Sequence, residues 1–197
     1  MAMTMTIRNS EREIRARRQQ YGFTFIEVMI AVAVLLVGLV GVLSVFAFGL
    51  AAMQFAQEDL IAKQKAREAL EGVYGARNTS QITYDMIQNV SNGGIFLDGL
   101  QPLLLAGNDG IIGTADDGPV ETLRLPGPDG VYGTADDTNV PLATFQRQIQ
   151  ITPVPLAGGG VNPDLRQISI TVQYSAGKSM GGSIRTYTVS SYISRFR

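Results

Sequence analysis

The chain has 197 residues, enough for one domain with its own hydrophobic core and an additional segment. Its net charge is −1, yet residues 1–22 hold five arginines and two glutamates, hence +3, which leaves −4 for the rest and argues against nucleic-acid binding. The absence of cysteine and histidine removes thiol chemistry, the usual general base and the commonest transition-metal ligand, so we do not expect an enzyme.

A long uncharged segment follows this basic leader, residues 1–22. The thirty residues between Glu27 and Glu58 carry no formal charge, and Ser44 is the only polar side chain from Val28 to Met53. About 20 apolar residues at 1.5 Å each span the hydrocarbon core of a bilayer. We therefore expect residues 23–53 to form a transmembrane helix, with the basic leader in the cytoplasm and the C-terminal body, residues 54–197, outside it.

The junction between leader and helix reads GFTFIEVMIAV, which resembles the N-terminal signal of type IV pilins and type II secretion pseudopilins. In that family a prepilin peptidase cuts after the glycine, here Gly22, and methylates the new terminal amine, here that of Phe23. The signal also includes a glutamate at the fifth position after the cut, here Glu27. The strong match covers roughly residues 15–50, and the remainder agrees only in architecture.

The resemblance implies a role for Glu27, which is placed just inside the apolar segment. In the family this glutamate meets the terminal amine of a neighbouring subunit during assembly. A charged side chain at mid-membrane costs about 2.5–3.5 kcal/mol, less near the interface, and pairing with an opposite charge offsets that cost while fixing the register of adjacent helices. The alternative is that Glu27 only extends toward the lipid headgroups.

The stretch IEVMIAVAVLLVGLVGV is most similar to V-type minor pilins and I-type pseudopilins. Many major pilins have a proline in this region, whereas this chain has none between Phe23 and Gln101. The resemblance therefore implies a structural subunit of a type IV pilus-like filament or a type II secretion machine. Its partners would be other pilin or pseudopilin subunits and the prepilin peptidase, and it would lie in the bacterial inner membrane before assembly.

Residues 54–76 are predicted to continue the helix with an amphipathic pattern. Apolar side chains recur at helical spacing at Ala62, Ala66, Ala69, Leu70 and Val73. Gly72 and Gly75 indicate that the helix ends near Tyr74.

Residues 143–197 read as an antiparallel sheet. Ile168, Ile170, Val172 and Tyr174 alternate with polar residues, as do Phe145, Ile149 and Ile151, although Arg147 breaks the second pattern. Residues 184–196 form a third candidate strand, and residues 153–164 and 175–182 are predicted turns. One apolar face of such a sheet needs cover, so we predict an α+β fold in which the amphipathic half-helix packs on it.

The intervening region, residues 77–142, is predicted to form loops and contains an internal repeat. GNDGIIGTADDG (107–118) recurs as GPDGVYGTADDT (127–138), and residues 98–137 hold eight acids and one base. Oxygen ligands on glycine-bent loops are what calcium prefers. The candidate ligands are Asp109, Asp116 and Asp117 in the first repeat, and Asp129, Asp136 and Asp137 in the second.

Two interpretations of the repeats stay open at this point, because Asp-Gly and Gly-Thr dipeptides also suit ordinary solvated turns. If the repeats bind calcium, the chain has an alternative function, that of a calcium-dependent, pilus-associated adhesin with its ligand-binding surface in residues 98–140.

Overall fold

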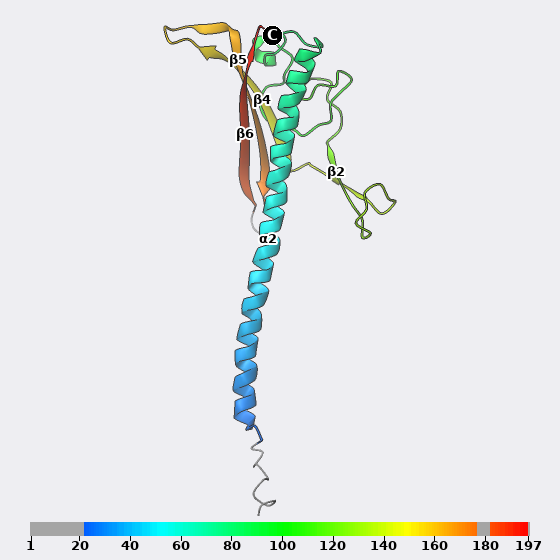
Figure 1. Cartoon of the computed structure of the whole chain (residues 1–197), viewed down its shortest axis with the longest axis vertical. Coiled ribbons are helices and arrows are strands. Elements are labelled where there is room, and N and C mark those ends of the chain that lie inside the picture. Colours follow the sequence, from blue (N-terminus) through cyan, green and yellow to red (C-terminus); the bar gives the residue numbers. More distant parts are fainter. Residues whose placement is uncertain (1–21, 177–181, 197) are drawn as a thin grey trace, which may run out of the picture. The chain divides into compact units, whose positions relative to one another are not determined.

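The computed structural model describes residues 22–176 and 182–196. The chain divides into two compact units, Met1–Gly49 and Leu50–Arg197. Helix α2 (Phe25–Asn78, 54 residues) is continuous through the boundary between them (Figure 1). Every residue from 25 to 50 is exposed, and the hydroxyl of Ser44 donates a hydrogen bond to the Val40 carbonyl (2.8 Å). Ser44, the one polar side chain between Val28 and Met53, is therefore satisfied within the helix itself.

The second part of α2 supplies one wall of the hydrophobic core. Ala62, Ala66, Ala69 and Val73 are each at most 2% exposed, and Leu70 packs beside them. The apolar stripe predicted from helical spacing is thus confirmed. Because four of the five buried apolar positions on this helix are alanines, its backbone can approach the sheet closely.

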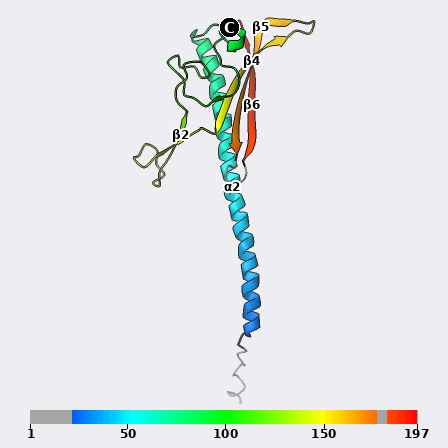
Figure 2. The same ribbon diagram turned by 180° about the vertical axis from the view of Figure 1, so that it is seen from behind.

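The other wall is a four-stranded antiparallel sheet in the order β1-β4-β5-β6 (Figures 1 and 2). Its strands are β1 (Gln101–Pro102), β4 (Phe145–Pro155), β5 (Val161–Ala176) and β6 (Ser183–Ser194). Ile149 pairs with Ile170, which pairs with Val189, and this face packs into the core. Hydroxyl pairs such as Thr171–Thr188 (3.0 Å) lie on the opposite face. The predicted α+β fold is confirmed.

The predicted turn at residues 153–164 is wrong in its extent. Strands β4 and β5 continue into it, so that only residues 156–160 connect them. The pairing shifts register between Pro153 and Pro155, and this irregularity lets prolines lie within a strand. Gly159 and Gly160 have positive φ angles of 91° and 83°, which the tight connection requires. Most of the other predicted turn, residues 177–181, lies outside the described residues.

The helix also ends later than predicted. Gly72 and Gly75 lie inside α2, which continues to Asn78 because Val73 and Ala76 are buried in the core beyond the first glycine. Ser80 then takes the left-handed conformation usual for glycine (φ 63°), and the Gln81 amide donates to the Ala76 carbonyl (2.9 Å). This is the 6→1 bond of a Schellman cap.

The region predicted as loops contains short elements of its own. Besides β1, they are the 3₁₀ helix η1 (Val90–Asn92) and the antiparallel strands β2 (Thr122–Leu125) and β3 (Thr138–Pro141). The buried Asn89 side chain ties this region to β4. It donates to the Ile149 carbonyl (2.7 Å) and accepts from the Ile151 amide (2.8 Å). These two backbone groups of β4 lie beyond the short strand β1 and would otherwise have no partner on that edge of the sheet.

Candidate functional site

The start of α2 holds the residues of the predicted processing signal. Gly22 and Phe23 precede the helix and are exposed, and a methyl group added at Gly22 would meet nothing within 4 Å. No described residue near Gly22 would therefore clash with such a group, so the structure gives no steric reason for glycine at this position. The basic leader preceding it, residues 1–21, lies outside the described residues.

Glu27 lies in the first turn of the helix, where Thr24 caps it. The Thr24 hydroxyl and carbonyl oxygens accept from the Glu27 amide at 3.3 and 3.1 Å. Thr24 and Glu27 have the spacing of a capping box, a signal that our sequence analysis overlooked. A carboxylate at this position also interacts favourably with the positive end of the helix dipole. Within residues 22–176 and 182–196, no Lys or Arg nitrogen lies within ion-pair distance of the Glu27 carboxylate.

The acidic repeats fold into two turns that share four aspartate–amide hydrogen bonds at equivalent positions, two in each repeat. In the first, Asp109 accepts from the Ile111 amide (2.8 Å) and Asp117 from the Gly113 amide (2.8 Å). The second repeats these bonds with Asp129 and the Val131 amide (2.8 Å) and with Asp137 and the Gly133 amide (2.7 Å). Each carboxylate satisfies a backbone donor that a tight turn would otherwise leave unpaired.

One threonine hydroxyl lies at the centre of each turn. Thr114 is 2.7 Å from Asp116, 3.2 Å from Asp109 and 3.5 Å from Asp117. In the second repeat, Thr134 is 2.6 Å from Asp136 and 3.4 Å from Asp137. The bond from threonine lowers the pKa of Asp116 and of Asp136, whereas burial raises the pKa of Asp117.

The structure thus brings the three predicted ligands of the first repeat together around the Thr114 hydroxyl. In the second repeat, Asp136 and Asp137 lie beside the Thr134 hydroxyl, and the Asp129 amide donates to Asp136 (3.5 Å). Across the part of the chain that the structure describes, no group of three or more acidic side chains has an arrangement that could hold a metal ion. Calcium binding would require carboxylates to exchange hydrogen bonds for metal coordination, and it stays a prediction.

A buried cluster of charges lies beside the first repeat, and sequence reasoning missed it. The Glu121 carboxylate is 2.5 Å from the Lys65 ammonium on α2 and 3.7 Å from Nη1 of Arg147 on β4. Glu121 and Arg147 are each 3% exposed. The second distance is too long for a hydrogen bond, and Nη1 of Arg147 has no hydrogen-bond partner in the described residues. The break that Arg147 makes in the apolar alternation of β4 was the available signal.

The pKa values in this cluster follow from burial and charge. Burial lowers the pKa of Arg147, and the carboxylate of Glu121 opposes that effect. Burial also acts to lower the pKa of Lys65, but hydrogen bonds to Glu121 and Glu68 outweigh it and raise the pKa above its ordinary value. The cluster joins the helix, β4 and the loop region at one point, which gives it a structural role.

Comparison with known proteins bears on the N-terminal part. Residues 17–43 match the family model described as the prokaryotic N-terminal methylation motif. The chain carries a type IV pilin-like signal. The match includes Gly22, Phe23 and Glu27, while the body lies outside it. No curated protein and no solved structure matches the chain.

A pilin-like signal implies processing by a peptidase and assembly with other pilin subunits. Structural subunits of this kind are usually not enzymes. Within the described residues, α2 is the one helix that is long and apolar enough to cross a membrane, judged by length and composition alone. The signal and this helix together fit a membrane-anchored pilin-like protein.

The first prediction concerns Glu121. Glu121→Gln leaves two cations without their buried counter-charge, and breaking a buried pair typically costs about 3–5 kcal/mol. Urea unfolding of the body, residues 54–197, should show a loss of this order. Glu68→Gln is the matched control, because Glu68 contacts the same Lys65 ammonium (2.8 Å) from an exposed position and should cost about 0–1 kcal/mol. Equal effects of the two substitutions would contradict a structural role specific to the buried carboxylate.

The second prediction concerns calcium. Binding to the folded repeats alone would stabilise the body by about 2.7 kcal/mol at a hundredfold excess over the dissociation constant. The body should then melt higher in calcium than in chelator, with magnesium a poor substitute because it demands tighter octahedral geometry. Asp116→Asn combined with Asp136→Asn should abolish most of the difference. Identical melting of the unsubstituted body in calcium and in chelator would identify the repeats as self-contained turns.

Proposed function

We propose that this chain is a structural subunit, a minor pilin or pseudopilin, of a type IV pilus-like filament or a type II secretion machine. The observation that carries the proposal is the methylation motif at residues 17–43, which runs directly into an apolar helix. The apolar helix segments of many subunits would bundle in the filament. The alternative, a calcium-dependent adhesin, has no observation in its favour.

The exposed first part of α2 supports this proposal. Its side chains are roughly half to four-fifths exposed, for example Val28 (48%), Leu35 (64%) and Phe25 (82%). An uncharged apolar helix surface of this extent is unfavourable in water and suits lipid or other helices. The core of the body, by contrast, is formed by residues from Ala62 onward, so it does not require that surface.

The proposed function implies an order of insertion, cleavage and assembly for the subunit. Before assembly the helix spans the inner membrane, with the arginines of the leader in the cytoplasm and the body outside. A prepilin peptidase cuts after Gly22 and methylates the amine of Phe23. The chain then moves from the membrane into the filament, and Glu27 pairs there with the terminal amine of a neighbouring subunit.

The third prediction is the processed terminus. In cells that carry the assembly machinery, mass spectrometry of the assembled protein should find Phe23 as the first residue, with a methylated amine. Substituting Gly22 by a bulky residue should block cleavage and leave the full-length chain in the membrane. Assembled protein that still begins at Met1 would contradict the proposed function.

The fourth prediction separates the two roles open to Glu27. Glutamine can replace glutamate in a capping box, so Glu27→Gln keeps the cap but removes the charge. We expect this variant to be inserted and cleaved normally, yet to be several-fold depleted in filaments. Thr24→Ala is the matched control, since it removes the capping hydroxyl and keeps the charge.

Incorporation is measured for cleaved chains only, so that a change in processing is not mistaken for a change in assembly. If cleaved Glu27→Gln chains assemble as well as Thr24→Ala chains, Glu27 has no pairing role and only extends toward the headgroups.

A further inference from the structure

The two acidic repeats share most of their internal hydrogen bonds but have different surroundings. Ile111 of the first repeat is 3% exposed and belongs to the core cluster with Phe96 and Ile149. A methyl group added at Gly113 would collide with the Ile149 side chain, whereas one added at the equivalent Gly133 would meet nothing within 4 Å. The first repeat is therefore docked against the body, and the second is not.

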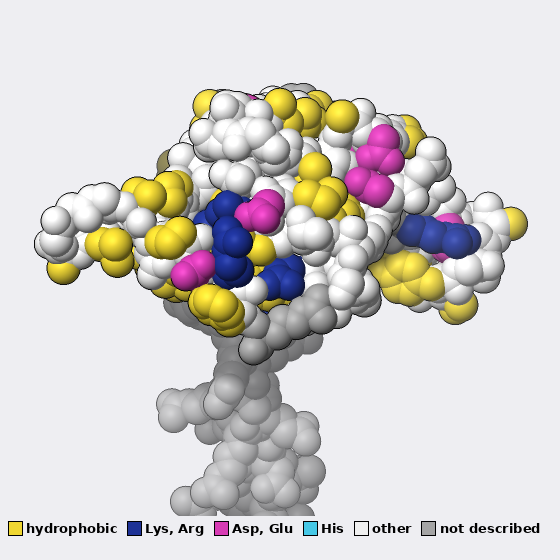
Figure 3. Space-filling model, turned by 90° about the horizontal axis from the view of Figure 1, so that it is seen from above, with side chains coloured by type: hydrophobic (Ala, Val, Ile, Leu, Met, Phe, Trp, Pro, Cys, Tyr) yellow, Lys and Arg dark blue, Asp and Glu magenta, His cyan; other side chains and the backbone are white. Residues whose placement is uncertain are grey.

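The second repeat presents apolar side chains to solvent where the first buries them. Val131, the counterpart of Ile111, is 55% exposed, and its neighbour Tyr132 is 67% exposed. The repeat lies between β2 and β3, which pair only with each other and project from the body in both ribbon views (Figures 1 and 2). Hydrophobic side chains are visible on this projection in the space-filling view, at the right of Figure 3. We call residues 127–137 the projecting turn.

The projecting turn also has acids without a basic partner. Asp137 is paired with Arg124 (2.6 Å), but no Lys or Arg of the described residues lies within ion-pair distance of Asp129 or Asp136. In the docked first repeat, Arg147 lies close enough to attract the carboxylate of Asp117. The docked repeat thus meets an apolar surface that the projecting turn lacks, and Asp129 and Asp136 of the projecting turn have no cation beside them among the described residues.

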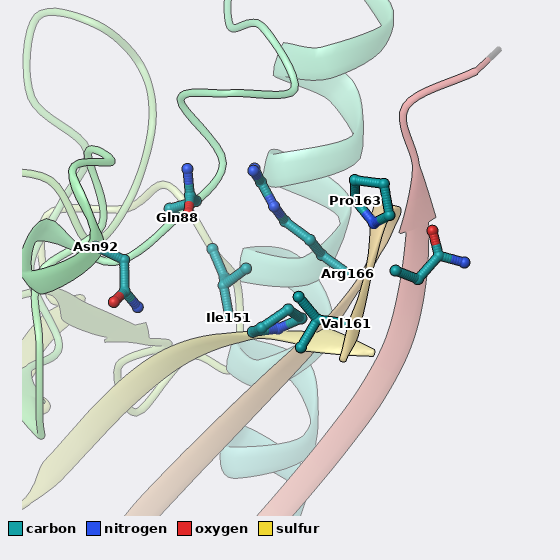
Figure 4. Close-up of a pocket in the computed structure, with 8 residues that line it drawn as sticks. Gln88, Asn92, Ile151, Val161, Pro163 and Arg166 are labelled. Carbon is teal, nitrogen blue, oxygen red and sulfur yellow. The ribbon is translucent and has the colours of Figure 1, made fainter. Parts of the chain in front are cut away.

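A pocket elsewhere on the body offers apolar side chains together with an arginine (Figure 4). It has a volume of about 370 Å³ and lies where the loop before η1 meets the ends of β4 and β5. Its apolar lining comes from Ile151, Pro153, Val161 and Pro163, and Arg166 also lines it.

Arg166 is half-buried and stacks on the Tyr84 ring, 4.1 Å from its centroid. It donates to the Ile87 carbonyl (2.9 Å) and to that of Tyr84. No Asp or Glu of the described residues lies within ion-pair distance of this guanidinium. These bonds to neutral carbonyls hold the side chain in place and leave its charge without a counter-ion among the described residues. The rest of the pocket combines apolar side chains with the polar Gln88, Asn92 and Asn162.

We propose that the projecting turn of one copy of this chain docks into the pocket around Arg166 of a second copy. Val131 and Tyr132 contact the apolar lining, and the carboxylates of Asp129 and Asp136 face the guanidinium. The projecting turn and the pocket are different surfaces of the body, so the contact is heterologous, and repeating it generates an open chain wherever its rotation does not close a ring. The proposal rests on the proposed function for the setting in which copies meet, and it adds that copies occupy adjacent positions.

Disulfide crosslinking of the full-length chain tests this contact, and the chain has no cysteine of its own. Tyr132→Cys and Val161→Cys change two exposed side chains, so neither should disturb the core. After mild oxidation of filaments, the double variant should give a ladder of dimers, trimers and larger species. Co-expression of the two single variants should stop at dimers, because each chain then offers one thiol. The matched control combines Tyr132→Cys with Ile184→Cys. The Ile184 side chain is 70% exposed but does not line the pocket.

The proposal predicts at least tenfold more crosslinked species from the Tyr132–Val161 pair than from the control pair. Equal yields from the two pairs, or no ladder from either, would overturn it. Recovery of the unsubstituted chain in filaments is scored separately with the same preparation. A chain that assembles without the crosslink refutes the docking contact and leaves the proposed function standing, whereas a chain absent from filaments counts against the proposed function itself.

Discussion

The fold of the body depends on covering one apolar sheet face with a helix that has few large side chains. Ile168, Ile170 and Val172 of β5 are fully buried, and the helix meets them with a stripe made mainly of alanine. Small side chains bring the helix backbone close to the sheet, so that one helix can close the core. Hydrogen bonds from long side chains then fix the position of the helix end. The Arg77 guanidinium donates to the Arg195 carbonyl (2.7 Å), and the Tyr74 hydroxyl donates to the Tyr192 carbonyl (2.7 Å).

The same helix has a different character in its first part because, between Glu27 and Glu58, its sequence carries no charge, and residues 28–53 show no amphipathic pattern. A helix with an apolar surface all round has no preferred face toward one sheet, and suits lipid or a bundle of like helices. One continuous α2 can therefore combine a segment that serves the body with a segment that serves the membrane or the filament. The change from uniform to striped hydrophobicity, near Met53, is readable in the sequence alone.

Sequence reasoning succeeded where periodicity decides structure and failed where single side chains do. Alternation identified the buried face of β5, and helical spacing identified Ala62 and Ala66. The continuation of α2 past Gly75 could not be read locally, because burial of Ala76 beneath the sheet outweighs the weak helix propensity of glycine. The site is similar: the aspartates that converge within each repeat were identified, but not the threonine between them. No local pattern distinguishes the docked repeat from the exposed one.

The chain places two carboxylates, those of Glu121 and Glu27, in apolar surroundings, and they differ in whether the same chain supplies a counter-charge. Glu121 is buried in the body and has two cations within the same chain, so its charge is compensated when the body folds. Glu27 lies at the start of an apolar helix and has no such partner among the described residues. A carboxylate that must leave water and lacks a counter-charge of its own either takes up a proton or pairs with a cation from another molecule. Under the proposed processing, cleavage after Gly22 would create a free terminal amine at Phe23, a cation that every processed copy could supply. Pairing between copies is therefore the arrangement that would compensate both charges once the apolar segments leave the lipid.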